Sequence, residues 1–162
     1  GNGLVKTGPG TLYLTGANTY TGLTTVGGGA LYVSTALQGN GSGAYESFMV
    51  NDGATFGVVN NGGLGQIENL TLGSSAGPTT LVFTNITASN VIIGGGGAAS
   101  VMEVYGDAGG ILTLNGNCTV RLANTNGLAV GNEYGLFYTL NPTNKNGAVY
   151  QLSPPARFLF IG

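Results

Sequence analysis

Short apolar or alternating runs, separated by clusters of Gly, Asn, Asp and Ser, follow one another along the whole chain. No window of a dozen residues keeps apolar positions at helical spacing without a glycine. The clusters supply the positive backbone angles and side-chain hydrogen bonds that turns need. The pattern therefore predicts an all-β chain. The predicted strands span residues 11–15, 30–34, 48–50, 54–59, 69–72, 80–84, 90–93, 100–105, 111–114, 119–122, 134–140, 148–152 and 157–161.

The predicted strands recur with a period. Leu12-Tyr13-Leu14 and Leu31-Tyr32-Val33 form the clearest pair, 19 positions apart, and weaker echoes follow at 54–56, 80–82 and 102–104. A spacing of about 20 residues, with two or three short strands per unit, is typical of one coil of a β-solenoid. Leucine-rich repeats share this period but need a fixed Leu and Asn frame that the sequence lacks. We therefore expect one β-solenoid domain over residues 1–162, with coils of about 20 residues.

A β-sandwich or mixed β fold is the alternative. Several Asn-Gly pairs between the predicted strands could each close a two-residue hairpin between antiparallel strands. Stacked coils explain the composition better, because only 6% of the residues are charged and like residues can form ladders along the stack. These pairs lie at residues 40–41, 61–62, 115–116, 126–127 and 146–147.

Composition and charge exclude several classes of protein. A chain that is 42% hydrophobic can form a core and is not disordered, although it holds 32 glycines. The net charge of −2 leaves no basic patch for nucleic acid or for an anionic membrane surface. The longest nearly uncharged apolar stretch, residues 91–102, is shorter than the roughly 18 residues that a spanning helix needs.

Residues 3–34 carry a specific motif. It runs as a Lys-Thr-Gly-x-Gly-Thr-Leu strand, then Asn-x-Tyr-x-Gly and Thr-Thr, then a Gly-x-Leu-x-Val strand. This segment resembles the strand repeat of bacterial autotransporter passenger domains, in which a Thr is frequent at the position of Ala30, and looser similarity continues through residues 48–162. The matching residues are Lys6, Thr7, Gly8, Gly10, Thr11, Leu12, Leu14, Gly16, Asn18, Tyr20, Gly22, Thr24, Thr25, Gly29, Leu31 and Val33.

The resemblance implies a right-handed parallel β-helix that is exported to the cell surface as a stalk, adhesin or fibre. It does not imply an enzyme. The membrane-inserted barrel that usually follows such a passenger is not in this sequence.

Candidate catalytic residues are few. Without His, a Ser-His-Asp or Cys-His triad and a His-based zinc site are excluded within one chain. Cys118, the only cysteine, is expected to be a buried small hydrophobic residue. Asp52 and Asp107 adjoin glycines and are expected in turns, and we expect no metal or cofactor. The six carboxylates, none in a local pair, are Glu46, Asp52, Glu68, Glu103, Asp107 and Glu133.

Two further groups of residues have both a structural and a binding interpretation. The glycine clusters at 27–29, 39–41 and 94–97 are expected in turns, because no Gly-Lys-Ser/Thr motif accompanies them. Tyr13, Tyr20 and Tyr32 could stack on sugars, although Tyr20 is expected to pack at a corner of the repeat.

The ends of the predicted solenoid show no polar or helical cap. Repeat sequence begins at Gly3-Leu4-Val5, and residues 157–161 form a strongly apolar strand. The chain is therefore expected to be either a fragment of a longer passenger or a subunit whose ends stack head to tail. The predicted assembly interface comprises Leu4, Val5, Phe158, Leu159, Phe160 and Ile161.

These observations favour a non-enzymatic, secreted or bacterial cell-surface structural protein that assembles with itself. An adhesin that binds glycan or a host surface is the alternative, and a polysaccharide-active enzyme is the third hypothesis. An exposed row of aromatic side chains would favour the adhesin. Three or more acidic groups converging in a groove would favour the enzyme.

Overall fold

The computed structural model describes residues 2–16, 20, 22–34, 46–59, 65–67, 69–74, 77–84, 102–105, 111–123, 137–140, 149–152 and 157–161. Within these ranges all regular structure is β-strand. No helix long and apolar enough to cross a membrane occurs among them.

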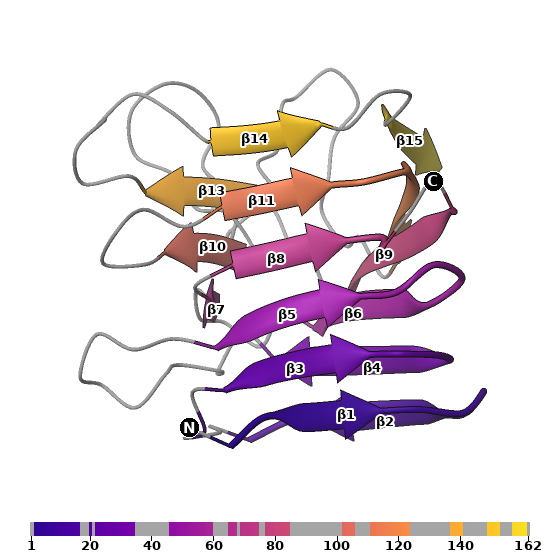
Figure 1. The fold of residues 1–162 in the computed structure, drawn as a ribbon, viewed down its shortest axis with the longest axis vertical. Helices are drawn as coiled ribbons and strands as arrows, with labels where there is room; N and C mark the ends of the chain where they lie inside the picture. Colours follow the sequence, from indigo (N-terminus) through magenta and orange to yellow (C-terminus); the bar gives the residue numbers. More distant parts are fainter. Residues whose placement is uncertain are drawn as a thin grey trace.

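The strands form three parallel sheets that stack coil upon coil (Figure 1). Sheet A contains β1 (Leu4–Lys6), β3 (Leu23–Val26), β5 (Ser47–Val50), β8 (Asn69–Leu72), β11 (Ile111–Leu114) and β14 (Val149–Leu152) in this spatial order. Sheet B contains β2 (Thr11–Leu14), β4 (Ala30–Ser34), β6 (Thr55–Val59), β9 (Thr79–Thr84), β12 (Asn117–Ala123) and β15 (Arg157–Ile161). Sheet C contains β7 (Gly65–Ile67), β10 (Met102–Tyr105) and β13 (Phe137–Leu140).

Every strand pair in the three sheets is parallel, and consecutive strands of the chain lie in different sheets. Leu12, for example, pairs with Leu31, one coil further along. This arrangement confirms the parallel β-solenoid and contradicts a sandwich built from hairpins, because a two-residue hairpin joins antiparallel neighbours.

The coil length changes along the chain. In sheet B, Leu12 pairs with Leu31, and Leu31 pairs with Phe56. Phe56 pairs with Leu81, and Leu81 pairs in turn with Val120. The sequence separation between partners is therefore shortest for the first pair and longest for the last. The predicted period describes the first coils, and the later coils are longer.

Because the later coils are longer, one predicted position of the repeat is wrong. The period predicts that residues 102–104 continue the ladder of residues 80–82, but they lie on β10 in sheet C. The strand that continues the sheet B ladder is β12, in which Val120 pairs with Leu81. A fixed period cannot anticipate where extra residues enter a coil, because insertions in solenoids are accommodated in the connections between strands.

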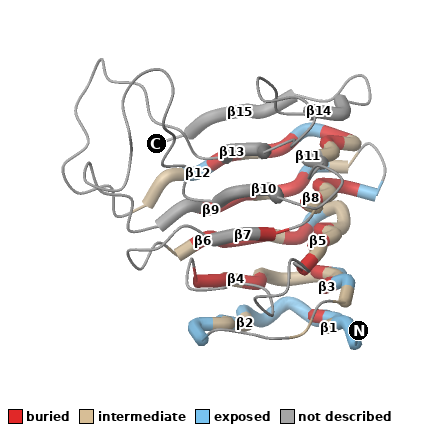
Figure 2. Tube along the Cα trace, turned by 90° about the vertical axis from the view of Figure 1, so that its left-hand side faces the viewer, coloured by how far each residue is buried: buried red, intermediate tan, exposed pale blue. Residues whose placement is uncertain are grey.

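The core is a stack of inward-facing ladders. In sheet B, Leu31, Phe56 and Leu81 follow one another in register, and none has any exposed surface. The Phe48 ring from sheet A meets the Phe56 ring at a centroid distance of 5.0 Å. Burial of such a side chain contributes about 1.5–3 kcal/mol, so the ladders hold the coils together. Figure 2 shows buried residues throughout the middle coils and exposed residues in the coil of β1 and β2.

Sheet A connects to sheet B through a tight corner that is repeated in successive coils. In the described part of the chain this corner has a glycine with positive φ in one coil after another, namely Gly8, Gly29, Gly53 and Gly73. At Gly29 the requirement is strict, because a Cβ would lie 2.3 Å from the carbonyl oxygen of Gly10. The cluster at residues 27–29 is thus a turn, as predicted, whereas residues 39–41 and 94–97 lie outside the described residues.

Candidate functional site

Cys118 is buried in the core of the solenoid. It has no exposed surface and carries a free thiol. Burial raises the pKa of this thiol, and the neighbouring Thr79 side chain and Leu81 backbone oppose the rise only in part. A neutral, buried thiol is a poor nucleophile. The structure therefore places Cys118 as the buried small hydrophobic residue that the sequence predicted.

Two of the six carboxylates, Glu46 and Asp52, have described side chains, and they lie beyond opposite ends of β5. Asp52 lies in the corner between β5 and β6, where its carboxylate accepts hydrogen bonds from the backbone N–H and the hydroxyl of Ser74, both at 3.2 Å. This turn position matches the prediction. The described residues contain no group of three or more His, Cys, Asp or Glu side chains that could hold a metal. Glu68, Asp107 and Glu133 lie outside the described ranges, and for Glu103 only the strand position is described.

Glu46 occupies an unexpected position inside the solenoid, next to the start of β5. Its side chain is 1% exposed, and neither carboxylate oxygen has a hydrogen-bond partner in the described part of the chain. Burial raises the pKa of this carboxyl to about 7. No sequence signal marks this position, because a lone Glu beside Tyr45 and Ser47 is typical of a surface residue.

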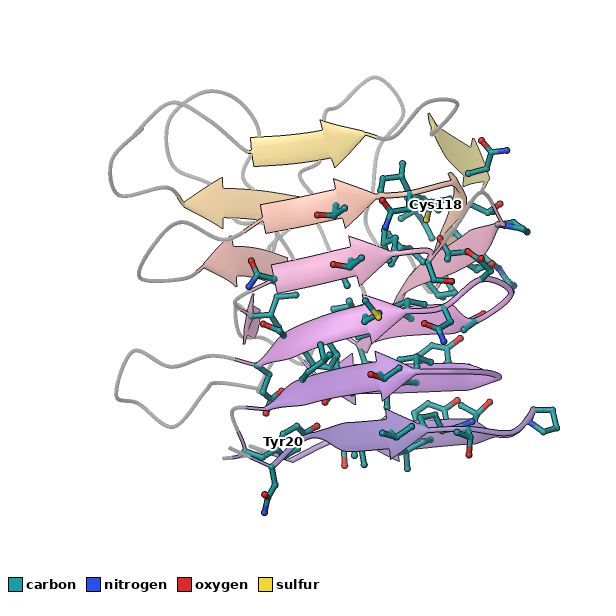
Figure 3. All side chains as sticks on the ribbon, viewed as in Figure 1. Tyr20 and Cys118 are labelled. Carbon is teal, nitrogen blue, oxygen red and sulfur yellow. The ribbon has the colours of Figure 1, made fainter. Side chains whose placement is uncertain are left out.

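Tyr20 lies near Glu46, toward the end of the solenoid opposite Cys118 (Figure 3). Its hydroxyl accepts a hydrogen bond from the Thr24 hydroxyl at 3.4 Å. Burial raises the pKa of the Tyr20 phenol, the Thr24 hydrogen bond lowers it, and the charge of Glu46 raises it again. The partial burial and the Thr24 contact agree with the predicted packing role for Tyr20.

Lys6, the first residue of the repeat motif, forms hydrogen bonds to the turns of two successive coils. Its side chain is 9% exposed, and its ammonium donates to the carbonyl oxygens of Thr7 and Gly8 at 2.9 Å and of Gly28 at 3.0 Å. These bonds use all three donors of the ammonium. Lys6 is therefore a structural cation in this coil.

The outer face of sheet B carries two stacked aromatic rings. Tyr13 and Tyr32 are register partners, and their ring centroids lie 5.0 Å apart with an interplanar angle of 23°. Tyr13 is 59% exposed. The Tyr32 ring lies over Gly57, the next residue in register, where a Cβ would come within 2.2 Å of the ring. In the described residues this is one exposed aromatic side chain stacked on a partly exposed one, and not the exposed row that would favour an adhesin.

The outer face of sheet A has a shallow groove of about 370 Å³. Within it, the Asn69 amide donates to the Ser47 hydroxyl at 3.3 Å. None of the lining side chains is an acid or a base, so the groove offers apolar surface and neutral hydrogen-bonding groups. The lining residues are Leu23, Ser47, Phe48, Met49, Asn69, Thr71 and Thr113.

The residues of the predicted assembly interface lie on the strands at the two ends of the sheets. Leu4 and Val5 belong to β1, the first strand of sheet A, and Val5 is 67% exposed. The other four belong to β15, the strand at the opposite end of sheet B. On β15, Phe158 pairs with Cys118 and Phe160 with Val120, so both phenylalanines are register partners of buried residues of β12.

The fold defines the class of this protein as a parallel β-solenoid. Residues 4–33 match the family model described as the passenger-associated-transport-repeat. This repeat suggests a passenger-like domain of a secreted or cell-surface protein. Searches among curated proteins and among solved structures each found no match.

Proposed function

We propose that the chain is a non-enzymatic structural element of an extracellular or cell-surface protein and that its end coils bind further coils of the same kind, giving a fibre. The observation that carries this proposal is the continuity of the stack. In the described part of the chain, sheets A and B each run through six strands, and every strand is paired in register with its neighbour. Such a stack can be extended indefinitely by the same contacts.

The edge of β1 supports the extension. The Lys6 carbonyl accepts a hydrogen bond from the Gly27 N–H at 2.8 Å, so the backbone groups of Lys6 point toward β3. Because successive residues of a strand alternate in direction, the N–H and carbonyl of Val5 point to the opposite side. There they are available to a strand from another coil.

The core at this end supports the same proposal. Leu12 and Leu14 pack against the core cluster but are only partly buried. Their register partners in the next coil, Leu31 and Val33, have no exposed surface. A further coil placed on β2 would bury the two leucines as completely, with a gain of about 25 cal/mol for each Å² of apolar surface covered.

Negative-stain electron microscopy of the purified chain over a concentration series tests this proposal. We expect fibres whose length increases with concentration. The variant Val5→Pro removes one N–H from the free edge of β1 and should abolish the fibres, whereas Val5→Thr keeps the N–H and should assemble normally. Monodisperse wild-type monomers throughout the series, or fibres formed equally by Val5→Pro, would contradict the proposal.

A further inference from the structure

The outer face of sheet B combines aromatic, hydroxyl and cationic side chains in regular columns. One column contains, in register, Tyr13, Tyr32, Gly57, Val82 and Arg121. Val82 is 5% exposed and Arg121 is exposed. The column therefore has two aromatic rings at one end, the buried Gly57 and Val82 in the middle, and one exposed guanidinium beyond them.

The aromatic end of the column is held in place. Gly57 has no side chain, and this allows the Tyr32 ring to lie across its backbone. Tyr13 stacks on that ring and keeps most of its own surface in solvent. Burial raises the pKa of the Tyr32 phenol, the neighbouring Tyr13 raises it further, and the positive charge of Arg121 lowers it.

A column of threonines runs beside the aromatic column. Thr55, Thr80 and Thr119 are consecutive register partners, and all three are partly exposed. Thr11 lies in the same column, two strands before Thr55. Because neighbouring strands are about 4.8 Å apart, the column presents one hydroxyl at each such step from Thr55 to Thr119, and Ala30 interrupts it between Thr11 and Thr55.

We propose that this surface, formed by Tyr13, Tyr32, Thr55, Thr80, Thr119 and Arg121 and called here the sheet B strip, binds a neutral polysaccharide. An extended chain of hexopyranose units would lie along the solenoid axis. Its C–H faces suit the exposed tyrosine ring, and its hydroxyl groups suit the threonine column. The step between strands is close to the length of one sugar unit in an extended chain, so successive units meet successive strands.

The charges of the strip select a neutral ligand. Arg121 is its one ionic group, and its other polar groups are the hydroxyls of threonine and tyrosine. An anionic polymer would need a cation at several successive steps, and nucleic acid would need a basic patch. The strip lies on the outer face of sheet B, whereas the structural role uses the ends of the stack, and of the strip residues only Tyr13 belongs to an end strand, β2.

Affinity gel electrophoresis tests the proposal with two soluble neutral probes, hydroxyethyl cellulose and galactomannan, and one anionic probe, carboxymethyl cellulose. We expect at least one neutral probe to retard the wild-type protein and the carboxymethyl probe to retard it less than hydroxyethyl cellulose. If neither neutral probe retards the protein, or if only the anionic probe does, the proposal is wrong. Fibre formation is measured separately, so the two proposals can fail independently.

Matched variants assign the binding to the strip. Tyr13→Ala should weaken binding about tenfold, whereas Tyr13→Phe keeps the ring and should bind nearly as well as the wild type. Thr80→Val removes one hydroxyl without changing the shape of the side chain, and it should weaken binding about threefold. Thr71→Val makes the same change on the outer face of sheet A and should have no effect. Equal losses in Thr80→Val and Thr71→Val, or none in Tyr13→Ala, would overturn the assignment, and circular dichroism checks the fold of each variant.

Discussion

At the scale of the residue, Glu46 should make the stability of the solenoid depend on pH. Its buried carboxyl has a pKa of about 7 in the folded state, against 4.5 for an exposed group, and burial is the cause. The folded chain therefore keeps this proton at pH values where the unfolded chain has lost it. The contribution of the neutral carboxyl is complete below pH 4.5 and is lost as the pH rises toward 7. We expect the free energy of unfolding to fall by about 2–3 kcal/mol over this window.

The variant Glu46→Gln isolates this effect, because an amide has a similar shape and does not titrate. Urea unfolding at pH 5 and at pH 8 should show a smaller loss of stability in the variant than in the wild type. Other carboxylates titrate equally in both proteins, so they cancel in the comparison. The same pH dependence in both proteins would mean that Glu46 is charged and solvated in the folded state.

At the scale of the element, the corner between sheets A and B determines whether consecutive coils can stack. Gly29 has φ of 65°, and a Cβ there would lie 2.3 Å from the Gly10 carbonyl oxygen and 2.5 Å from that of Gly8. We expect Gly29→Ala to lower the free energy of unfolding by about 3 kcal/mol, as backbone strain adds to the steric clash. Gly10→Ala is the control, because a Cβ at Gly10 meets no atom within 4 Å. Guanidinium denaturation compares the two, and equal midpoints would show that the corner adapts to a side chain.

The elements also show how much of the fold and of the site the sequence could predict. Alternating runs with frequent β-branched residues identified twelve of the fifteen strands in the described residues, and the Leu-Tyr-Leu echo matches the register of β2 with β4. Strands β1, β3 and β7 were missed, because β1 and β7 have three residues each and β3, Leu-Thr-Thr-Val, falls inside the motif between two predicted strands. The predicted strand at residues 90–93 lies outside the described residues.

The site was harder to predict than the strands, because it depends on neighbours that are distant in the sequence. The stacking of Tyr13 on Tyr32 requires the register of β2 with β4, and the position of the Tyr32 ring requires a glycine in the following coil, Gly57. Burial of Lys6 and Glu46 likewise depends on three-dimensional stacking, since sequence statistics place both residue types at the surface. The apolar periodicity repeats over short sequence distances and could be recognised in the sequence. The burial of these polar residues depends on contacts between distant parts of the chain and could not.

At the scale of the whole molecule, each coil contacts only its neighbours, so the position of a destabilising change should decide how the chain unfolds. Phe56 lies in the middle of the stack, has no exposed surface and meets the Phe48 ring at 5.0 Å. Phe56→Ala should lower the free energy of unfolding by about 3–5 kcal/mol. We expect β1–β4 then to unfold independently of β8–β12. Leu12→Ala removes a partly buried side chain from the end coil and should loosen β1 and β2 alone. Hydrogen exchange measured by mass spectrometry follows each segment. If Phe56→Ala raises exchange uniformly along the chain, the solenoid unfolds as one cooperative unit, and the coils are coupled over longer distances than contacts between neighbours provide.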